Sequence, residues 1–574
     1  MYWFIKSPDA QHVQRLKNEF RCSTPIAKVL ANRGIVSLEE SRSFFNPSLS
    51  QLHDPFSMKD MDRAVERIIQ NITDQIPILV FGDYDVDGTT GASVLYLALQ
   101  QFGAKVETYI PDREKEGYGL SNEGLNHGKE IGANLIITCD CGINAFDHVN
   151  YANSEGLDVI ITDHHTPDET LPDAYAILNP KRQDCEYPFK GLCGCGVALK
   201  LVQAVGMKTE QDLNIVWDLL DLVTLGTASD MVPIIDENRI IVHHGLSLIP
   251  STSKAGLQAL LRLAGLEDKL PTVGQLVFGV APRINAAGRL GDANRSVELL
   301  TTMDSNRAND LANELDVENK RRQDIQLSVI DEAIRKVNAE VDLVNDRAIV
   351  LAGLGWHAGV VGIVASRIKE EYNRPSIVIS MDKDGTGKGS ARSVHGLDLY
   401  EALTKVNQWL EGYGGHPMAA GLTVTAENYN SFRQAFLDVA NSTLTDEDLI
   451  PSLYLDGDLA LKDIDQRFLT FLEKLGPFGP SNMRPKFATT GVEIAGNPRV
   501  IGNGDHIRFR ARQGRTTFNA IGFNQSHQYE TLIKGLPVDL AYVVELNVWQ
   551  GHTNVQLNIR DIALSKDHNI KRLI

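Results

Sequence analysis

Three aspartates alternate in the segment FGDYDVDGTT: Asp83, Asp85 and Asp87. They follow the apolar run Ile76–Val80 and come just before a glycine. Carboxylates held this close together repel one another unless a positive charge lies among them. Hard divalent cations bind carboxylate oxygens and remove this repulsion. The segment therefore predicts a cation site, and a solvated acidic turn is the alternative that the segment alone leaves open.

The pattern Asp-x-Asp-x-Asp-Gly also begins a calcium-binding EF-hand loop. The last ligand of that loop is a glutamate at the twelfth position, where this chain has Val94. An EF-hand loop also follows a helix, whereas the apolar run before Asp83 is typical of a strand. We therefore exclude an EF-hand.

Three further apolar segments end on residues that could join this group. NLIITCDCG carries Asp140, LDVIITDHH carries Asp163, His164 and His165, and LVTLGTASDMVP carries Asp230. We interpret the apolar part of each segment as a strand, and the carboxyl ends of parallel strands line one crevice where ligands bind. A single aspartate of this kind often caps a helix. Four such strand ends together predict one functional cluster.

The residue types in this cluster favour Mn²⁺ or Mg²⁺. Five carboxylates and one imidazole, without a thiolate, suit these ions better than Zn²⁺. The oxygens suffice for two ions that share one carboxylate, an arrangement that activates water against phosphate esters. Zinc at the pairs Cys139/Cys141 and Cys193/Cys195 is the weaker alternative, because Cys-x-Cys lacks the usual zinc-knuckle spacing.

The elements that must position these residues alternate along the chain. Short apolar runs at residues 76–80, 105–110, 134–138 and 157–161 are separated by helix-like stretches, which predicts a parallel sheet with crossover helices. Residues 301–340 contain neither Pro nor Gly and predict a long helix.

We divide the chain into five parts. The segment after the long helix begins a second α/β unit, and the short alternating runs near the C-terminus predict a small β-barrel of the OB type. The expected parts are a helical N-terminal lead-in, an α/β catalytic domain, a connecting helix, a second α/β domain and an OB-like nucleic-acid-binding domain, at residues 1–50, 51–300, 301–344, 345–447 and 448–574.

The composition excludes several classes of protein. Of the 574 residues, 43% are hydrophobic, and no run approaches the roughly 20 apolar residues of a membrane span. Six cysteines and the lack of a secretory signal favour a reducing cytoplasm. The net charge of −18 argues against indiscriminate binding to polyanions. It permits a local basic groove, because distant charges are screened within about 8 Å.

The order of the motifs DYDVDG, CDCG, TDHH and GTASD resembles that of the DHH phosphoesterases. The similarity continues through APRINAAGRL, GWHAGVVGIVASRI, GKGSARS and GGHPMAAGL, the last of which resembles the DHH-associated domain. The long helix and the β domain after LGPFGPSNMRPKF narrow the resemblance to the RecJ family. It implies two α/β domains joined by a long helix and followed by an OB-like domain.

The resemblance also implies an activity and a metal site. The expected activity is metal-dependent exonuclease cleavage of single-stranded DNA in the 5′→3′ direction, in DNA repair and recombination, with two Mn²⁺ or Mg²⁺ ions as cofactors. One ion would be bound by Asp83, Asp85 and Asp140. The other would be bound by Asp87, Asp140, His164 and Asp230, so that Asp140 is shared. The division of ligands between the ions is left open.

Three residues receive catalytic roles: Asp140, Asp163 and His165. We expect His165 to contact the substrate phosphate, because side chains of adjacent strand residues point apart and His164 is the metal ligand. We expect Asp163 to orient an imidazole or a loop amide.

Recognition of a terminal phosphate requires planar, bidentate donors, which favours arginine. The candidates in the family motifs are Arg113, Arg289, Ser390 and Arg392. Five further residues in such motifs are expected to line the substrate groove: Arg283, Asn285, His357, Arg367 and His416. In the last domain Arg508, Arg510 and Arg512 alternate on one strand beside Phe509 and could contact phosphates.

Two alternatives to a single-strand exonuclease stay open. A phosphodiesterase for nanoRNA or cyclic dinucleotides would need only the two α/β units, whereas this chain has a further β domain. An inactive DNA-binding scaffold would have lost some ligands, whereas every expected acid is present. The expected substrate is single-stranded DNA, with single-strand-binding protein and a helicase as candidate partners. We expect a cytoplasmic monomer without membrane contact.

Overall fold

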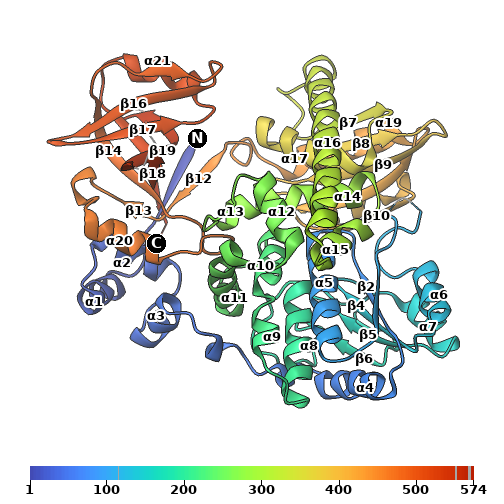
Figure 1. The fold of residues 1–574 in the computed structure, drawn as a ribbon. Coiled ribbons are helices and arrows are strands. Elements are labelled where there is room, and N and C mark those ends of the chain that lie inside the picture. Colours follow the sequence, from blue (N-terminus) through green and yellow to red (C-terminus); the bar gives the residue numbers. More distant parts are fainter. Residues whose placement is uncertain (114, 550–551, 566–569, 574) are drawn as a thin grey trace. The chain divides into compact units, whose positions relative to one another are not determined.

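The computed structural model describes residues 1–113, 115–549, 552–565 and 570–573 (Figure 1). The chain divides into two compact units. The smaller unit comprises residues 286–292 and 313–451 together with Met1, and the larger unit comprises residues 2–285, 293–312 and 452–574.

The larger unit contains a five-stranded parallel sheet in the order β3-β2-β4-β5-β6. In that order the strands are Val106–Tyr109, Ile78–Gly82, Leu135–Cys139, Asp158–Thr162 and Ala176–Leu178. Strands β2 and β4 are buried at every position because helices cover both faces of the sheet. Figure 1 shows α6 and α7 on one face and α5 and α8 on the other. These helices are Asn122–Glu130, Phe146–Ser154, Val86–Gln101 and Gly194–Lys208. The predicted parallel sheet is confirmed.

Further helices complete this part of the larger unit. They are α4 (Met61–Asp74), α9 (Asn214–Trp217), α10 (Leu220–Ser229), α11 (Asp236–Leu248), α12 (Ala255–Leu263), α13 (Val273–Gln275) and α15 (Asn294–Thr301). Two helices have residues in both units: α14 (Ala281–Leu290) and α16 (Ser305–Glu340). With 36 residues, α16 is the predicted long helix.

The apolar stretch before Asp230 is helix α10, and the prediction of a strand there was wrong. Residues 220–228 of this helix are all buried. A run that is apolar on all sides has no periodicity that distinguishes a buried helix from a buried strand.

The smaller unit is built on a mixed sheet in the order β10-β11-β9-β8-β7. In that order the strands are Gly412–His416, Ala419–Thr425, Thr386–Arg392, Ser376–Met381 and Ile349–Leu354. Strands β7 and β8 are parallel, and the other neighbours are antiparallel. The helices are α17 (Ala358–Tyr372), α18 (Leu399–Lys405) and α19 (Tyr429–Thr443). The second α/β unit is therefore confirmed.

The C-terminal part of the larger unit is a β-barrel. Its strand order is β13-β14-β18-β19-β17-β16-β15, and an additional pairing of β14 with β16 closes it. In chain order, β13 to β19 are Gly457–Asp458, Lys486–Ile494, Arg499–Ile501, His506–Gln513, Thr516–Gly522, Val538–Trp549 and His552–Leu564. Helices α20 (Gln466–Lys474) and α21 (Tyr529–Ile533) accompany these strands. The predicted small barrel is confirmed.

The N-terminal segment differs from the expected helical lead-in because it begins with a strand. Strand β1 (Tyr2–Lys6) lies between β12 (Ser452–Leu455) and β20 (Ile570–Leu573) and is parallel to both. Helices α1 (Ala10–Phe20), α2 (Thr24–Asn32) and α3 (Leu38–Phe45) follow it. Buried residues of α1 and α2 share one hydrophobic core with the barrel. Aromatic and β-branched residues in YWFIK favour a strand, and the predicted division missed this local signal.

Among the described residues, no helix combines the length and the apolar character that spanning a bilayer requires.

Candidate metal centre and substrate-binding residues

The larger unit brings the six predicted metal ligands together: Asp83, Asp85, Asp87, Asp140, His164 and Asp230. Three neighbouring strands supply most of them, since Asp83 and Asp85 follow β2, Asp140 follows β4, and His164 follows β5. Parallel strands end at one edge of their sheet, so these side chains meet there. Helices supply the other two: Asp87 lies in the first turn of α5, and Asp230 follows the last turn of α10.

The possible ligand atoms form three groups, each with all its atoms within 4.8 Å of one another. The groups are Asp83–Asp85–Asp140, Asp87–His164–Asp230 and Asp140–His164–His165. Asp140 belongs to two of them, and its Oδ1 atom lies 3.1 Å from Nε2 of His164. This geometry suits two neighbouring cations that share one carboxylate. The assignment of each ligand to an ion stays a prediction.

Several atoms of the cluster are buried without a hydrogen-bond partner in the described structure: Oδ1 of Asp83, Oδ1 of Asp140, Oδ2 of Asp230 and both ring nitrogens of His164. An unsatisfied buried polar atom costs about 1–3 kcal/mol. A hard divalent cation would satisfy the oxygens and accept a nitrogen as a further ligand. The residues therefore fit Mn²⁺ or Mg²⁺.

The cluster is electrostatically unfavourable on its own. Burial is the main cause that raises the pKa values of Asp83, Asp87 and Asp140, and neighbouring carboxylates raise them further. The pKa of Asp230 rises to about 9, first through burial and then through the charge of Asp87. Burial lowers the pKa of His164, so its imidazole stays neutral and can act as a ligand. A bound cation would displace the protons that these carboxyl groups otherwise retain.

Helix α8 supports the cluster through its N-terminus. The backbone N–H groups of Gly194 and Cys195 donate to the carboxylate of Asp87 at 2.6 and 2.9 Å, as expected where a helix N-terminus meets negative charge. A Cβ atom at Gly194 would lie 2.5 Å from Cβ of Asp140. Glycine therefore lets this helix approach both carboxylates.

The cysteines of the two Cys-x-Cys pairs are buried free thiols. Cys193 caps α8, since its Sγ atom accepts a hydrogen bond from the backbone N–H of Gly196 at 3.3 Å. None of the metal-ligating groups found among the described residues contains a cysteine.

His165 lies beside His164, and the expected divergence of the two side chains was wrong. Their ring centroids are 4.6 Å apart. Nδ1 of His165 lies 2.7 Å from Oδ1 of Asp163, and the same oxygen accepts from the backbone N–H of His164 at 2.7 Å. Burial acts to lower the pKa of His165, but the hydrogen bond and charge of Asp163 outweigh it and raise the pKa. With 41% of its side chain exposed, His165 is open to a ligand.

Two residues near the cluster were not predicted. The hydroxyl of Tyr118 donates to the carbonyl oxygen of Asp140 at 3.2 Å and lies 3.4 Å from the ring nitrogens of His165. The charge of Lys181 acts on His164, His165 and Asp230. Tyr118 lies between Gly117 and Gly119, which both have a positive φ. The two flanking glycines were the signal that the sequence offered. Lys181 follows β6, whose three residues are too few for a periodic pattern.

Three predicted substrate-binding residues lie in the larger unit near its helices and loops. Arg113 is exposed, and its guanidinium lies 5.1 Å from the ring centroid of Tyr84, next to Asp83 in the chain. Arg283 donates to the carbonyl oxygens of Gly279 and Leu263. Its guanidinium therefore contributes to holding α14, where Asn285 also lies.

In the smaller unit, four predicted residues gather around the N-terminus of α17. The ring of His357 accepts from the backbone N–H of Gly359 at 3.0 Å, and Arg289 donates to the carbonyl oxygen of Gly359 at 2.9 Å. Arg392 donates to Oγ of Ser390 at 2.9 Å. A Cβ atom at Gly362 of α17 would lie 3.2 Å from that Oγ atom and 3.3 Å from Nη2 of Arg392. Guanidinium groups beside a helix N-terminus favour an anion.

The remaining predicted residues have other surroundings. Arg367 pairs with Glu371 on α17 at 3.0 Å, and His416 is exposed at the end of edge strand β10. Arg508 and Arg510 are exposed on β16, and Arg499, which was not predicted, lies opposite Arg508 on β15.

Two other residues of β16 have surroundings that limit what they can bind. Phe509 is buried in the barrel core, so it is not available to stack on a base. Arg512 pairs with Glu493 at 2.6 Å.

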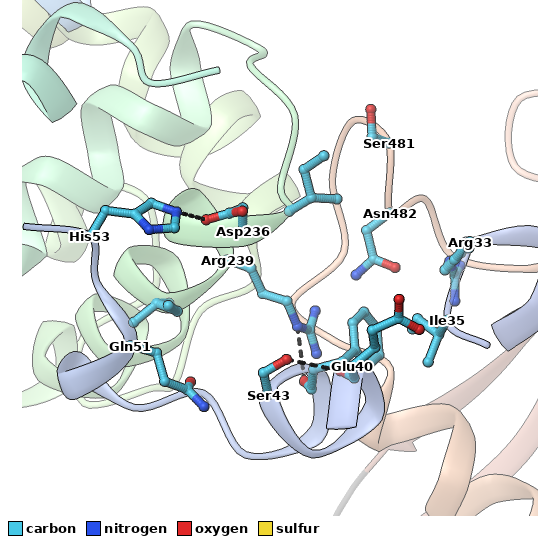
Figure 2. A pocket seen from close by; sticks show the side chains of 14 residues that line it. Arg33, Ile35, Glu40, Ser43, Gln51, His53, Asp236, Arg239, Ser481 and Asn482 are labelled. Carbon is cyan, nitrogen blue, oxygen red and sulfur yellow. Dashed lines mark hydrogen bonds and ion pairs between the residues drawn. The ribbon is translucent and has the colours of Figure 1, made fainter. Parts of the chain in front are cut away.

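A cavity of about 470 Å³ lies elsewhere in the larger unit (Figure 2). Arg33, His53, Asp236, Arg239 and Asn482 are among the residues that line it. Figure 2 shows His53 paired with Asp236 at 2.9 Å. Arg239 is bound to backbone carbonyl oxygens on two segments, including those of Phe44 at 3.0 Å and Gly476 at 2.6 Å. The metal-ligating groups lie outside this lining.

Comparison with protein families matches three parts of the chain. Residues 77–227 match the DHH family, N-terminal domain; residues 345–442 match the DHHA1 domain; and residues 455–561 match the RecJ OB domain.

Individual proteins match over nearly the whole chain. The single-stranded-DNA-specific exonuclease RecJ of Bacillus subtilis (strain 168) is 39% identical over 570 residues, which cover 99% of this chain and 71% of that protein. The crystal structure of RecJ in complex with Mn²⁺ from Thermus thermophilus has a TM-score of 0.84 at 28% identity and covers 99% of this chain and 80% of that chain. The Mg²⁺ complex from the same organism has a TM-score of 0.77 at 27% identity and covers 98% and 78%.

Proposed function

Because the chain belongs to the RecJ family of single-stranded-DNA-specific exonucleases, we propose that it hydrolyses the phosphodiester bonds of single-stranded DNA from the 5′ end, in DNA repair and recombination. The observation that carries this proposal is the presence of three metal-ligating groups at one sheet edge, two of which share Asp140. A β-barrel that matches the RecJ OB domain follows in the same chain. Such a barrel suits a polymeric substrate better than a dinucleotide.

The proposed metal centre uses the ligands that the structure brings together. Asp83, Asp85 and Asp140 would hold one ion, and Asp87, Asp140, His164 and Asp230 would hold the other. Mn²⁺ or Mg²⁺ bound there would supply an activated water molecule and neutralise charge on a phosphorane-like transition state.

The residues around the metal centre have supporting roles. Asp163 fixes the ring of His165, which is partly exposed and carries a raised pKa. A protonated His165 donates a hydrogen bond to a phosphate oxygen. The N–H groups of Gly194 and Cys195 hold the carboxylate of Asp87 in place. Each of these groups positions or stabilises charge, which is how an enzyme lowers the barrier to phosphate-ester cleavage.

The 5′→3′ direction requires a stop, because a metal centre cleaves any diester that reaches it. Arg392 and Ser390, beside the N-terminus of α17, are suited to grip a 5′-terminal phosphate, and Arg289 binds the same helix turn. Burial lowers the pKa of Arg392, and no carboxylate in the described part of the chain pairs with it. A terminal monoester carries more charge than a diester and is the preferred anion for such a guanidinium.

Further features of the protein belong to the same proposal. Single-strand-binding protein and a helicase are candidate partners, and the chain would act as a monomer. A cytoplasmic location is consistent with the buried free thiols.

A panel of labelled substrates tests the function. The protein with Mn²⁺ should shorten 5′-phosphorylated single-stranded DNA and leave duplex DNA, RNA and a cyclic dinucleotide largely intact. Hydrolysis of the dinucleotide without cleavage of the polymer would assign the chain to small-substrate phosphodiesterases. Binding of DNA without cleavage of any substrate would identify an inactive scaffold.

A further inference from the structure

The terminal strands of the larger unit form a small sheet with two different faces. In β1, Trp3 and Ile5 are fully buried and pack with Leu455, Ala488 and Ala541. Successive side chains of a strand alternate between faces. Tyr2, Phe4 and Lys6 therefore lie on the opposite, outer face, so the buried tryptophan fixes the direction of the aromatic residues on either side of it.

The register of the three strands aligns an aromatic and basic row on this outer face. Phe4 on the central strand is opposite Tyr454 on β12 and opposite Lys571 on β20. The rings of Phe4 and Tyr454 are stacked, with centroids 5.3 Å apart and planes at 20°. Nζ of Lys571 lies 4.6 Å from the ring centroid of Tyr2 and 5.7 Å from that of Phe4. Tyr454, at the end of the row, is 49% exposed.

The charge on this face is positive although the whole chain carries a net charge of −18. The three strand sequences YWFIK, SLYL and IKRL contain no acid. Three acids nearby already have partners, since Asp458 pairs with Arg572 at 2.9 Å, Asp561 accepts from Nε1 of Trp3 at 2.8 Å, and Asp456 accepts from the backbone N–H of Lys486 at 3.1 Å. In the described part of the chain, neither Lys6 nor Lys571 forms an ion pair with a carboxylate.

A second group of cations adjoins the row. The pKa of Lys486, at the start of β14, is lowered first by burial and then by the charge of Arg560; the charge of Asp456 raises it, and that of Lys6 lowers it. Arg560 and Lys6 are therefore each close enough to Lys486 to repel its ammonium group. Such a group of cations beside the exposed ring of Tyr454 and the half-buried rings of Tyr2 and Phe4 favours a ligand that carries regularly spaced negative charge.

We propose that the outer face of the β12-β1-β20 sheet binds single-stranded DNA, with bases stacked on Tyr454 and the neighbouring rings and with phosphates at Lys571 and Lys6. Its residues are distinct from the metal ligands and from the arginines of β16. It would hold the part of a long strand that is not being cleaved. Stacking on rings accepts every base, as a strand of arbitrary sequence requires. The aromatic rings favour single-stranded DNA over a purely acidic peptide, because such a peptide could pair with the lysines but has no base to stack on the rings.

The test compares a platform variant with a matched control in the full-length protein. The platform variant is Tyr454→Ala/Lys571→Ala. The control is Tyr400→Ala/Lys383→Ala, which removes the same residue types from the surface of the smaller unit, where Tyr400 is also 49% exposed. Binding of labelled oligothymidylate is measured by anisotropy without metal, for strands of about 6 and about 30 nucleotides, within and above the roughly 4–16 nucleotides that one OB domain covers.

The proposal, which rests on the proposed function, expects the platform variant to bind the long strand about tenfold more weakly, in the range of a lost base–ring contact. The slope of its log Kd against log salt should be shallower by about 0.7, the value of one phosphate contact on a single strand. Its binding of the short strand, and its cleavage of that strand in Mn²⁺, should match the control. Cleavage of the short strand reports the nuclease activity alone. If neither the control nor the platform variant cleaves it, the proposed function fails, whereas the strand-binding proposal is judged from the affinity for the long strand.

Three results would overturn the proposal. They are unchanged affinity for the long strand, equal weakening for both lengths, or loss of binding to an acidic peptide without loss of strand binding. The last result would assign the face to a protein partner. If the double variant unfolds, Tyr454→Ala and Tyr454→Phe are compared instead, because Tyr454 is half exposed and phenylalanine retains the stacking surface. The proposal then requires that only the alanine variant loses affinity.

Discussion

Oδ1 of Asp140 lies 3.1 Å from Nε2 of His164, and neither atom has a hydrogen-bond partner in the described structure. The two residues follow different strands, β4 and β5, which the parallel sheet places side by side. Asp140 also has a φ of 64°, a conformation that non-glycine residues rarely adopt. Strain and unsatisfied buried atoms persist where a function requires them. A cation held between the carboxylate of Asp140 and the imidazole of His164 accounts for their close approach, for their unsatisfied atoms and for the strained backbone of Asp140.

The close approach of α8 makes Gly194 a sensitive position. Gly194→Ala should reduce cleavage at least tenfold and weaken Mn²⁺ binding, because its Cβ atom would lie 2.5 Å from Cβ of Asp140 and displace the carboxylate. Gly274→Ala is the control, since a Cβ atom there meets nothing within 4 Å. Titration calorimetry with Mn²⁺ and a cleavage assay check both variants. Equal activity of the two variants would show that the approach of α8 is not required.

The raised pKa of Asp230 predicts how the metal-free protein responds to pH. A carboxyl group with a folded-state pKa near 9 and an ordinary value of 3.8 binds its proton more tightly in the folded state. Its contribution to stability is therefore lost as pH rises between these values. The Tm without metal should fall from about pH 5 to pH 9, and Asp230→Asn should flatten this slope. The exposed Asp324 on α16 supplies the control, Asp324→Asn.

The increase in Tm that Mn²⁺ produces should depend on pH in the opposite sense to the Tm of the metal-free protein. The ion requires deprotonated carboxylates, so the stabilisation that it adds grows as pH rises. Thermal unfolding with and without a saturating concentration of Mn²⁺ measures this difference. An unchanged slope in Asp230→Asn, or stabilisation by Mn²⁺ that shrinks at higher pH, would contradict the proposed ligand set.

The grouping of the candidate metal ligands could largely be predicted because these residues follow short apolar runs. The positions of Asp83, Asp140 and His164 after β2, β4 and β5 follow from the rule that parallel strands end at one edge. Asp230 was identified although its segment is a helix, because the acid lies at the end of a buried run in either case.

Other features depend on contacts that no local pattern encodes. The orientation of His165 is set by its hydrogen bond to Asp163 and not by alternation along a strand. Phe509 alternates with arginines, but which face of β16 is buried depends on the closure of the barrel. The pairing of β1 with β12 and β20 joins residues at opposite ends of the chain, and sequence spacing contains no signal for it.

The end-recognition proposal predicts a change in substrate preference. Arg392→Ala should weaken binding of 5′-phosphorylated strands by about 1–3 kcal/mol, the range for hydrogen bonds of charged groups. Binding of 5′-hydroxyl strands should change less, so the two affinities converge. Arg335→Ala, an exposed arginine of α16, is the control. The affinities are compared at fixed salt because phosphate contacts are salt-sensitive. If Arg392→Ala keeps the full preference for 5′-phosphorylated strands, Arg392 does not recognise the 5′ end, and this role would be assigned to Arg289 or Arg283.

The central claim is that Asp140 serves two divalent cations at once, and the most direct measurement is the number of Mn²⁺ ions bound per chain together with the cleavage rate, in the wild type and in Asp140→Ala. The account predicts two ions in the wild type. It predicts that Asp140→Ala loses high-affinity binding of both ions, retains its fold, and cleaves single-stranded DNA at less than about a tenth of the wild-type rate. A variant that still binds two ions, or that cleaves faster than this limit, would contradict the account.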